Sequence, residues 1–298
     1  MARAHESEMI QTHTQTPQEE GHEVASIETA TETATHEPTI YAEPIFEIGN
    51  FSVTNSLFSS TLVTITLVIV FILVRTKIKR IPKGIQNFFE MILEGALDFT
   101  DTITRDRKTS EKLLPVVLAL FLFILLNNWF GLLPVIGTVG FYEIHDGHNM
   151  FIPFFRGGTA DLNMTLALAL FAVIFSHLLG VFTIGAWKHF NKFINIEAFL
   201  EIPKKFKKDK NVIFINPVKF FVGLMEIVGE LAKVMSLSLR LFGNIFAGEV
   251  LLASMATILA FILPVPFFFL EVLVGMVQAA VFSILTLVFL SMSVHAEH

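Results

Sequence analysis

The sequence predicts an all-α protein that crosses a membrane, on two observations. Of its 298 residues, 53% are hydrophobic and 16% are charged, whereas about a quarter of the residues are charged in an average soluble domain. Several uncharged apolar runs also approach the roughly 20 residues that a helix needs to cross a hydrocarbon core. This composition argues against a soluble globular enzyme. The absence of cysteine excludes disulfide frameworks and thiolate metal sites.

The chain divides into two regions of different composition. Residues 1–50 hold ten Glu and one Arg among many polar residues, so they bury too little apolar surface to offset chain entropy. We predict a disordered acidic tail there and an integral membrane domain over residues 51–298. That domain has 20 basic and 17 acidic residues, a surplus too weak for a nucleic-acid-binding face.

Five segments are predicted to cross the membrane. The last two are long and are separated by the turn-like LPVP, which indicates a terminal hairpin. The predicted segments are residues 57–74, 113–139, 162–187, 217–260 and 264–294. Between Lys83 and Thr104, apolar residues recur every three or four positions, which predicts an amphipathic helix lying along the membrane interface.

Loop charge predicts the orientation in the membrane. Residues 75–112 hold nine basic and six acidic residues, and residues 188–219 hold eight basic and three acidic residues. Because loops with excess Lys and Arg stay on the cytoplasmic side, we expect the N-terminus outside and the C-terminus in the cytoplasm.

The fourth segment is too long for a perpendicular span. As a helix, residues 217–260 would extend about 60 Å, twice the hydrocarbon thickness. The segment is therefore either broken or strongly tilted. Its charged residues would be costly against lipid, so we expect them to face protein or water. Among them are Glu226, Glu230, Lys233, Arg240 and Glu249.

Arg240 is the first candidate functional residue, because its guanidinium stays charged in any environment. The nearest charges in the chain are seven residues before it and nine after it, which argues against an arginine that merely reaches a helix end. At 100° per residue, Ser236 and Asn244 lie one turn to either side. Lys233 and Glu226 continue this polar stripe, while Glu249 faces away from it.

The hairpin geometry pairs residues by depth. Arg240 with Gln278, and Glu249 with Glu271, are centred on nearly the same point of the chain, so antiparallel helices would place each pair at one level. Two carboxyls at one depth repel when both are ionised, which lets the pair hold and release a proton. The alternative is a carboxyl pair satisfied by Ser, Thr or water, with no transport role.

The stretches SLSLRLFGNIFAGEVLL and VQAAVFSILTLVFLSMS closely resemble the a subunit of the F-type ATP synthase. The resemblance extends to LMEIVGELAKVMSLSLR, NNWFGLLP and GGTADLNMTLALAL, and covers most of residues 50–295. It implies a bacterial plasma membrane protein that is not catalytic alone and couples proton flow to ATP synthesis. The implied partners are the c-ring, the b subunits of the peripheral stalk and membrane lipid, with no cofactor, metal or nucleic acid.

The resemblance also assigns roles to residues. Arg240 matches the arginine that faces the c-ring carboxylate, and Asn244 and Gln278 match the polar residues beside it. The outer half-channel is matched by Glu249 and Glu271, whereas the inner one is matched by Glu226. Some relatives carry His at one of the two outer positions, which here are both Glu.

Asp161 and Asn163 fall in the ADLN stretch, where a role at the channel mouth and a helix cap are both open. His145 and His148 are expected in an exposed loop rather than a metal site, and His177 in a helix-packing contact. The main rival class is a stand-alone secondary transporter or ion channel. Such proteins often contain internal repeats, which this sequence lacks.

Overall fold

Five long helices form the frame of the protein in a computed structural model, which describes residues 41–49, 51–79, 84–133, 139–145, 148–187, 212–259 and 262–294. Each of the five is long and apolar enough to cross a membrane, which confirms the predicted all-α membrane class. They are α2 (Asn55–Lys77), α4 (Arg107–Leu132), α5 (Leu162–Ile184), α8 (Val212–Ile258) and α9 (Pro264–Val294). Because α8 is one helix of 47 residues, the fourth segment is not broken.

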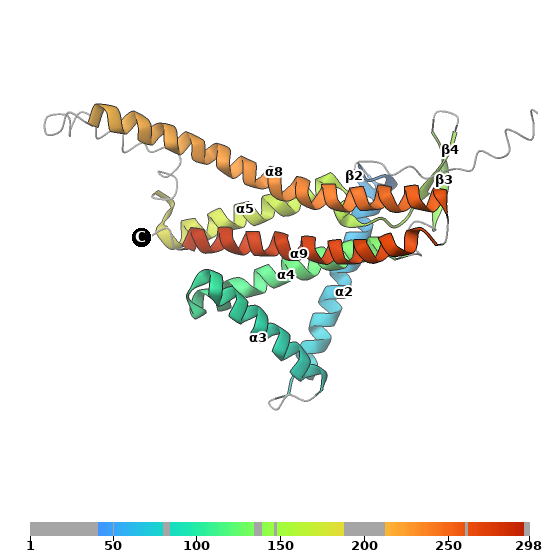
Figure 1. Cartoon of the computed structure of the whole chain (residues 1–298), viewed down its shortest axis with the longest axis horizontal. Coiled ribbons are helices and arrows are strands. Elements are labelled where there is room, and N and C mark those ends of the chain that lie inside the picture. Colours follow the sequence, from blue (N-terminus) through green and yellow to red (C-terminus); the bar gives the residue numbers. More distant parts are fainter. Residues whose placement is uncertain are drawn as a thin grey trace, which may run out of the picture.

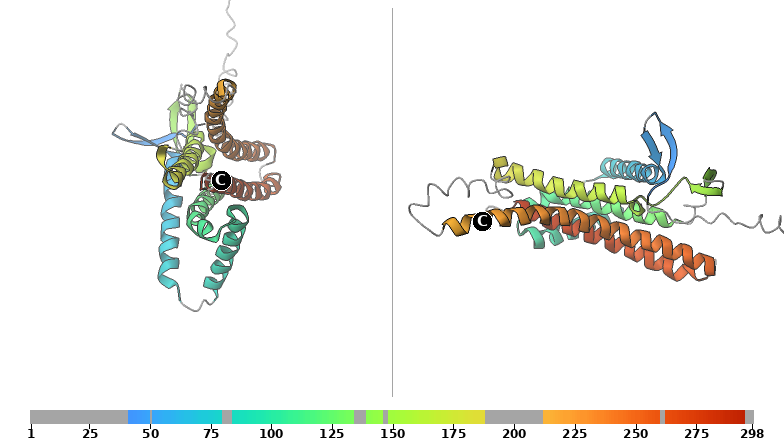
Figure 2. Two further views of the ribbon diagram at one scale, coloured as in Figure 1. Left: turned by 90° about the vertical axis from the view of Figure 1, so that its left-hand side faces the viewer. Right: turned by 90° about the horizontal axis from the view of Figure 1, so that it is seen from above.

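Four of these helices run along the long axis of the molecule, where α8 and α9 lie antiparallel (Figures 1 and 2). Helix α5 packs against both members of this hairpin, and α4 packs against α9. Their shared core consists mainly of small and branched side chains, including Ile124, Ala169, Leu241 and Ala279. Helix α2 instead crosses steeply beside α4 and leaves most of its apolar side chains exposed, as expected of a surface that faces lipid.

Polar caps fix where three of the helices begin. Thr54 accepts a hydrogen bond from Leu57 N at the start of α2, and Asp106 accepts one from Thr109 N at the start of α4. Asp161 does the same for Asn163 N at the start of α5. These are the residue types that satisfy the free N–H groups of a first helical turn.

Two of the predicted spans end earlier than hydropathy indicates. Helix α4 ends at Leu132 because Leu133 precedes a proline and adopts an extended conformation. Helix α5 ends at Gly185, whose φ of 94° leaves the helical region.

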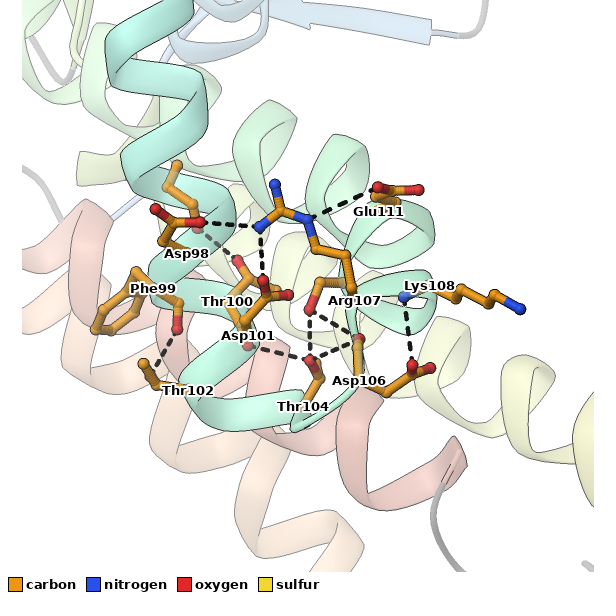
Figure 3. Close-up of polar contacts among 12 residues, drawn as sticks. Asp98, Phe99, Thr100, Asp101, Thr102, Thr104, Asp106, Arg107, Lys108 and Glu111 are labelled. Carbon is orange, nitrogen blue, oxygen red and sulfur yellow. Dashed lines mark hydrogen bonds and ion pairs between the residues drawn. The ribbon is translucent and has the colours of Figure 1, made fainter.

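The predicted amphipathic helix is present as α3 (Ile85–Thr104) and carries exposed apolar side chains such as Phe89 and Ile92. A short elbow joins it to α4. There the Arg107 guanidinium pairs with Asp98 at 2.9 Å and with Asp101 at 2.6 Å (Figure 3). The placement of α3 at the membrane interface stays a prediction.

Two β-hairpins were not predicted. Strand β1 (Pro44–Ile48) pairs with β2 (Phe51–Thr54), and β3 (Gly140–His145) pairs with β4 (His148–Pro153). The sequence analysis placed residues 41–49 in the acidic tail, whereas β1 belongs to the folded domain. Composition missed it because strand pairing uses backbone groups and needs no apolar run. The rest of the predicted tail and the lysine-rich residues 188–211 lie outside the described residues.

Candidate functional site

Two cavities open along the hairpin. The first has a volume of about 250 Å³ and lies between α4, the β4–α5 connection, α8 and α9. We call it the carboxyl cavity because Glu249 and Glu271 both line it, together with Arg156 and Asn128. The sequence placed the two carboxyls at one depth, and in the structure both line the same cavity.

Glu249 forms an ion pair that the sequence did not predict. Its Oε2 accepts a hydrogen bond from Nη2 of Arg156 at 2.9 Å. The Arg156 side chain is only 2% exposed, and its Nη1 donates to the carbonyl of Tyr41 at 3.0 Å. A buried guanidinium therefore lies in the wall of the carboxyl cavity.

Glu271 has different surroundings. It is buried on α9, and its carboxyl group lies against Gly248 of α8. Among the described residues, no hydrogen bond or ion pair joins the Glu271 side chain to another group. The two carboxyls of this cavity are therefore not equivalent, since Glu249 has a cation partner and Glu271 has none in the described part of the chain.

The second cavity, of about 280 Å³, lies between an earlier stretch of α8 and a later stretch of α9 than the first. We call it the arginine groove because Arg240 lines it, with Lys233 and Ser236 from α8 and Phe289 from α9. Arg240 is exposed, and its Nη2 donates to Ser236 Oγ at 3.0 Å. The carboxyl cavity and the arginine groove share no lining residue.

The other residues of the predicted stripe are only partly brought together. Asn244 is exposed on the same helix, and Gln278 is half-buried on α9. No hydrogen bond joins Arg240 to Gln278 within the described part of the chain, because the guanidinium engages Ser236 one turn away. Matching depth alone does not determine which side chain the arginine contacts.

A charged cluster extends from the arginine groove to α5. The Glu230 carboxyl accepts a hydrogen bond from Lys233 Nζ at 2.7 Å and lies 3.4 Å from His177 Nε2. Lys233 also lies over the ring of Phe289, 5.0 Å from its centroid. The predicted inner residue Glu226 is half-buried one turn before Glu230. His177 is thus a contact between helices, as expected, but its partner is a carboxylate.

Asp161 acts as a helix cap with both carboxyl oxygens engaged. Oδ1 accepts from Asn163 N at 3.0 Å, and Oδ2 accepts from Ser56 Oγ of α2 at 2.8 Å. Asp161 is buried and does not line the carboxyl cavity, while Asn163 is exposed. Of the two open roles, the geometry favours the cap.

Sequence reasoning missed two members of these sites, Arg156 and Glu230. Arg156 is the only basic residue of residues 140–161, which also hold Glu143, Asp146 and Asp161, and a single cation in an otherwise acidic loop is a signal for a specific carboxylate partner. Glu230 lies three residues before Lys233, a spacing at which side chains meet on a helix. That spacing was visible in the sequence, whereas the contact with His177 was not.

Comparison with known proteins places this arrangement in context. A family model described as ATP synthase A chain matches residues 57–291. The chain belongs to the ATP synthase A chain family. The match includes three of the five long helices completely and nearly all of α2 and α9, and the family consists of membrane subunits of the ATP synthase.

Individual relatives agree with the family model. ATP synthase subunit a of Syntrophobacter fumaroxidans is 30% identical over 225 residues, which are 74% of this chain and 76% of the relative. The subunit a of Campylobacter concisus is 30% identical over 81% of this chain and 90% of its own length. That of Mycobacterium ulcerans is 31% identical over 73% of this chain and 76% of its own. This chain is therefore a multi-pass membrane protein of ATP synthesis and proton transport.

Proposed function

We propose that this chain conducts protons through two offset half-channels and that Arg240, facing a c-ring, separates them. The observation that carries the proposal is that Arg240 lines one of two cavities that share no lining residue, whereas Glu249 and Glu271 line the other. In this role the chain couples transmembrane proton flow to ATP synthesis without being catalytic alone.

The exposed face of α8 supports a protein partner at Arg240. Large apolar side chains are exposed on the helix around the guanidinium, including Leu231, Met235 and Leu239. A guanidinium at the centre of a lipid bilayer costs about 2.5–3.5 kcal/mol. A carboxylate on a c-ring that covers this face would offset that cost, and Asn244 and Gln278 would offer polar groups on either side.

The carboxyl cavity supports the outer half-channel. Its volume of about 250 Å³ accommodates several water molecules, and its wall carries Glu249 and Glu271. Protons would enter from outside through this space and pass to a c-subunit carboxylate. Asp161 and Asn163 lie at the predicted outer end of α5, where a role at the channel mouth is the alternative to the helix cap that the geometry favours.

The arginine groove and its neighbours support the inner half-channel. Glu226 lies about four turns before Arg240 on α8, and Glu230 and Lys233 lie between them. Protons released by the ring would leave along this charged stretch. Because Arg240 keeps its positive charge, it repels protons and favours the ionised form of a facing carboxylate, which must release its proton before passing.

The arrangement of the helices supports the predicted tilt. Helix α2 lies at a steep angle to the long axis of the α8–α9 hairpin (Figure 1). If α2 crosses the bilayer in the usual way, the hairpin lies strongly tilted and can follow the curved wall of a ring. The loop charges support an orientation with the N-terminus outside and the C-terminus in the cytoplasm, on the side where b subunits of a peripheral stalk would attach.

The test compares Arg240→Ala with Ser236→Ala in the assembled complex. ATP-driven acidification of inverted membrane vesicles is measured together with c-ring copurification. We expect Arg240→Ala to assemble but to pump no protons. Ser236→Ala keeps the charge and removes its hydrogen-bond partner, so we expect it to pump at a reduced rate. Normal pumping by Arg240→Ala would refute the proposal.

A second measurement separates the proposal from a stand-alone transporter or channel. The purified chain is reconstituted into liposomes without a c-ring, and its proton conductance is compared with that of empty liposomes. We expect no difference. A conductance that Arg240→Ala leaves unchanged would support the rival class.

A further inference from the structure

Arg156 belongs to none of the long helices, yet its guanidinium reaches the wall of the carboxyl cavity. It lies in the connection between β4 and α5, and its contacts reach other parts of the chain. Its backbone N–H donates to Ser59 Oγ of α2 at 3.1 Å, and its guanidinium contacts Tyr41 before β1 and Glu249 on α8.

The backbone around Arg156 is held in a fixed position. A methyl group on Gly131 of α4 would meet the Cα of Gly157 at 2.8 Å. One on Gly158 would overlap the side chains of Ser60 and Asn127. The connection therefore packs closely against α2 and α4. The guanidinium is therefore presented to the cavity by a packed loop, which suits a fixed charge.

The Arg156 guanidinium gives the two carboxyls of the cavity different surroundings. It lies 2.9 Å from Glu249, while Glu271 lies against Gly248 without a hydrogen bond to another described residue. A carboxylate held by a buried guanidinium has its charge balanced and its orientation fixed. The Glu271 carboxyl lines the same cavity, and no described cation balances its charge or fixes its orientation.

We propose that Arg156 is a positioning residue of the outer half-channel, which clamps Glu249 to the cavity wall and leaves Glu271 as the carboxyl that exchanges protons. The inference rests on the proposed function and specifies which carboxyl of the outer half-channel exchanges the proton. A hydronium ion in the cavity transfers its proton to a carboxylate oxygen of Glu271 and becomes water. Glu271 then passes that proton towards the c-ring carboxylate and returns to its ionised form.

The first test compares three single variants in the assembled complex, with ATP-driven pumping normalised to the amount of copurified c-ring. We expect Arg156→Gln to lower the rate about tenfold, because it leaves the Glu249 charge in the cavity without its cation. Arg156→Lys keeps the charge and should retain about half of the rate. Ser59→Ala removes the backbone contact but not the charge and should pump almost normally.

Two outcomes of this comparison would overturn the inference. One is wild-type pumping by Arg156→Gln. The other is a rate for Arg156→Lys as low as that of Arg156→Gln, which would mean that the charge itself is not used.

A double variant tests whether Arg156 acts through Glu249. Because Arg156→Gln with Glu249→Gln removes both charges, it should pump faster than Arg156→Gln alone. A rate below that of Arg156→Gln would contradict the clamp. The assignment of the exchanging carboxyl requires in addition that Glu271→Gln slows pumping more than Glu249→Gln, and the reverse order would refute it.

The Arg240→Ala variant keeps the two proposals distinguishable. If Arg240→Ala pumps normally, the proposed function fails. If Arg240→Ala is inactive while Arg156→Gln pumps normally, only the role of Arg156 fails.

Discussion

Gly248 on α8 lies directly against the carboxyl group of Glu271 on α9, so that a methyl group at position 248 would overlap the carboxyl carbon. Helix α8 therefore approaches α9 closely at a proposed proton-exchanging group. Only a residue without a side chain leaves Glu271 its present place in the cavity wall.

Gly248→Ala is accordingly expected to displace the Glu271 carboxyl and to slow ATP-driven pumping about tenfold, because overpacking of this kind costs about 1–3 kcal/mol. Shortening the carboxyl by one methylene, in Gly248→Ala with Glu271→Asp, should recover part of the rate. The measurement is the initial rate of vesicle acidification per assembled complex.

Gly95→Ala on α3 is the matched control, since a methyl group there meets no atom within 4 Å. It should pump at the wild-type rate. Equal rates for Gly248→Ala and Gly95→Ala would show that the close approach does not constrain Glu271.

Asp161 offers a test between its two open roles. Asp161→Asn keeps an oxygen that accepts from Asn163 N but removes the charge, so we expect normal assembly and nearly normal pumping. Asp161→Ala removes the cap of α5, which costs about 1 kcal/mol, and should lower the amount of assembled complex. An assembled Asp161→Asn complex that conducts no protons would instead assign the charge to the channel mouth.

The elbow between α3 and α4 predicts a pH-dependent contribution to stability. Hydrogen bonds from the Thr109 hydroxyl at 2.7 Å and from its backbone N–H at 3.0 Å lower the pKa of the Asp106 carboxyl from its usual value of 3.8. A carboxyl with a lowered pKa in the folded state stabilises the protein above its usual pKa. That contribution is lost as the pH falls through the lowered value.

We therefore expect Asp106→Ala to lower the melting temperature of the detergent-solubilised complex by a few degrees near pH 7. The difference from wild type should shrink once the pH falls below 3.8. Asp106→Asn keeps an uncharged cap and serves as the control. A difference between wild type and Asp106→Ala that is constant down to about pH 3 would contradict an ionised cap.

The five long helices were predictable because hydropathy is a local property of the chain. An apolar run must be buried in lipid or protein wherever it lies. The isolation of Arg240 was visible for the same reason, since a charge within an apolar run is evident from its neighbours. The common depth of Glu249 and Glu271 needed only one further assumption, an antiparallel hairpin that turns between them.

The contacts that distinguish one carboxyl from another were not predictable in this way. Arg156 and Glu249 are 93 positions apart in the chain, and no periodicity relates a connection before α5 to a turn of α8. Strand β1 was assigned to a tail because its pairing with β2 uses backbone groups rather than apolar side chains.

The sequence by itself determined the class of the protein, the number of its spans and the charge at the centre of the fourth one, since each follows from residues that are neighbours in the chain. Only the tertiary structure decided that Glu249 is held by a buried guanidinium and that Glu271 lies against a glycine. Both depend on how separate helices and a packed loop meet, and charge interactions depend on distances in space rather than along the chain.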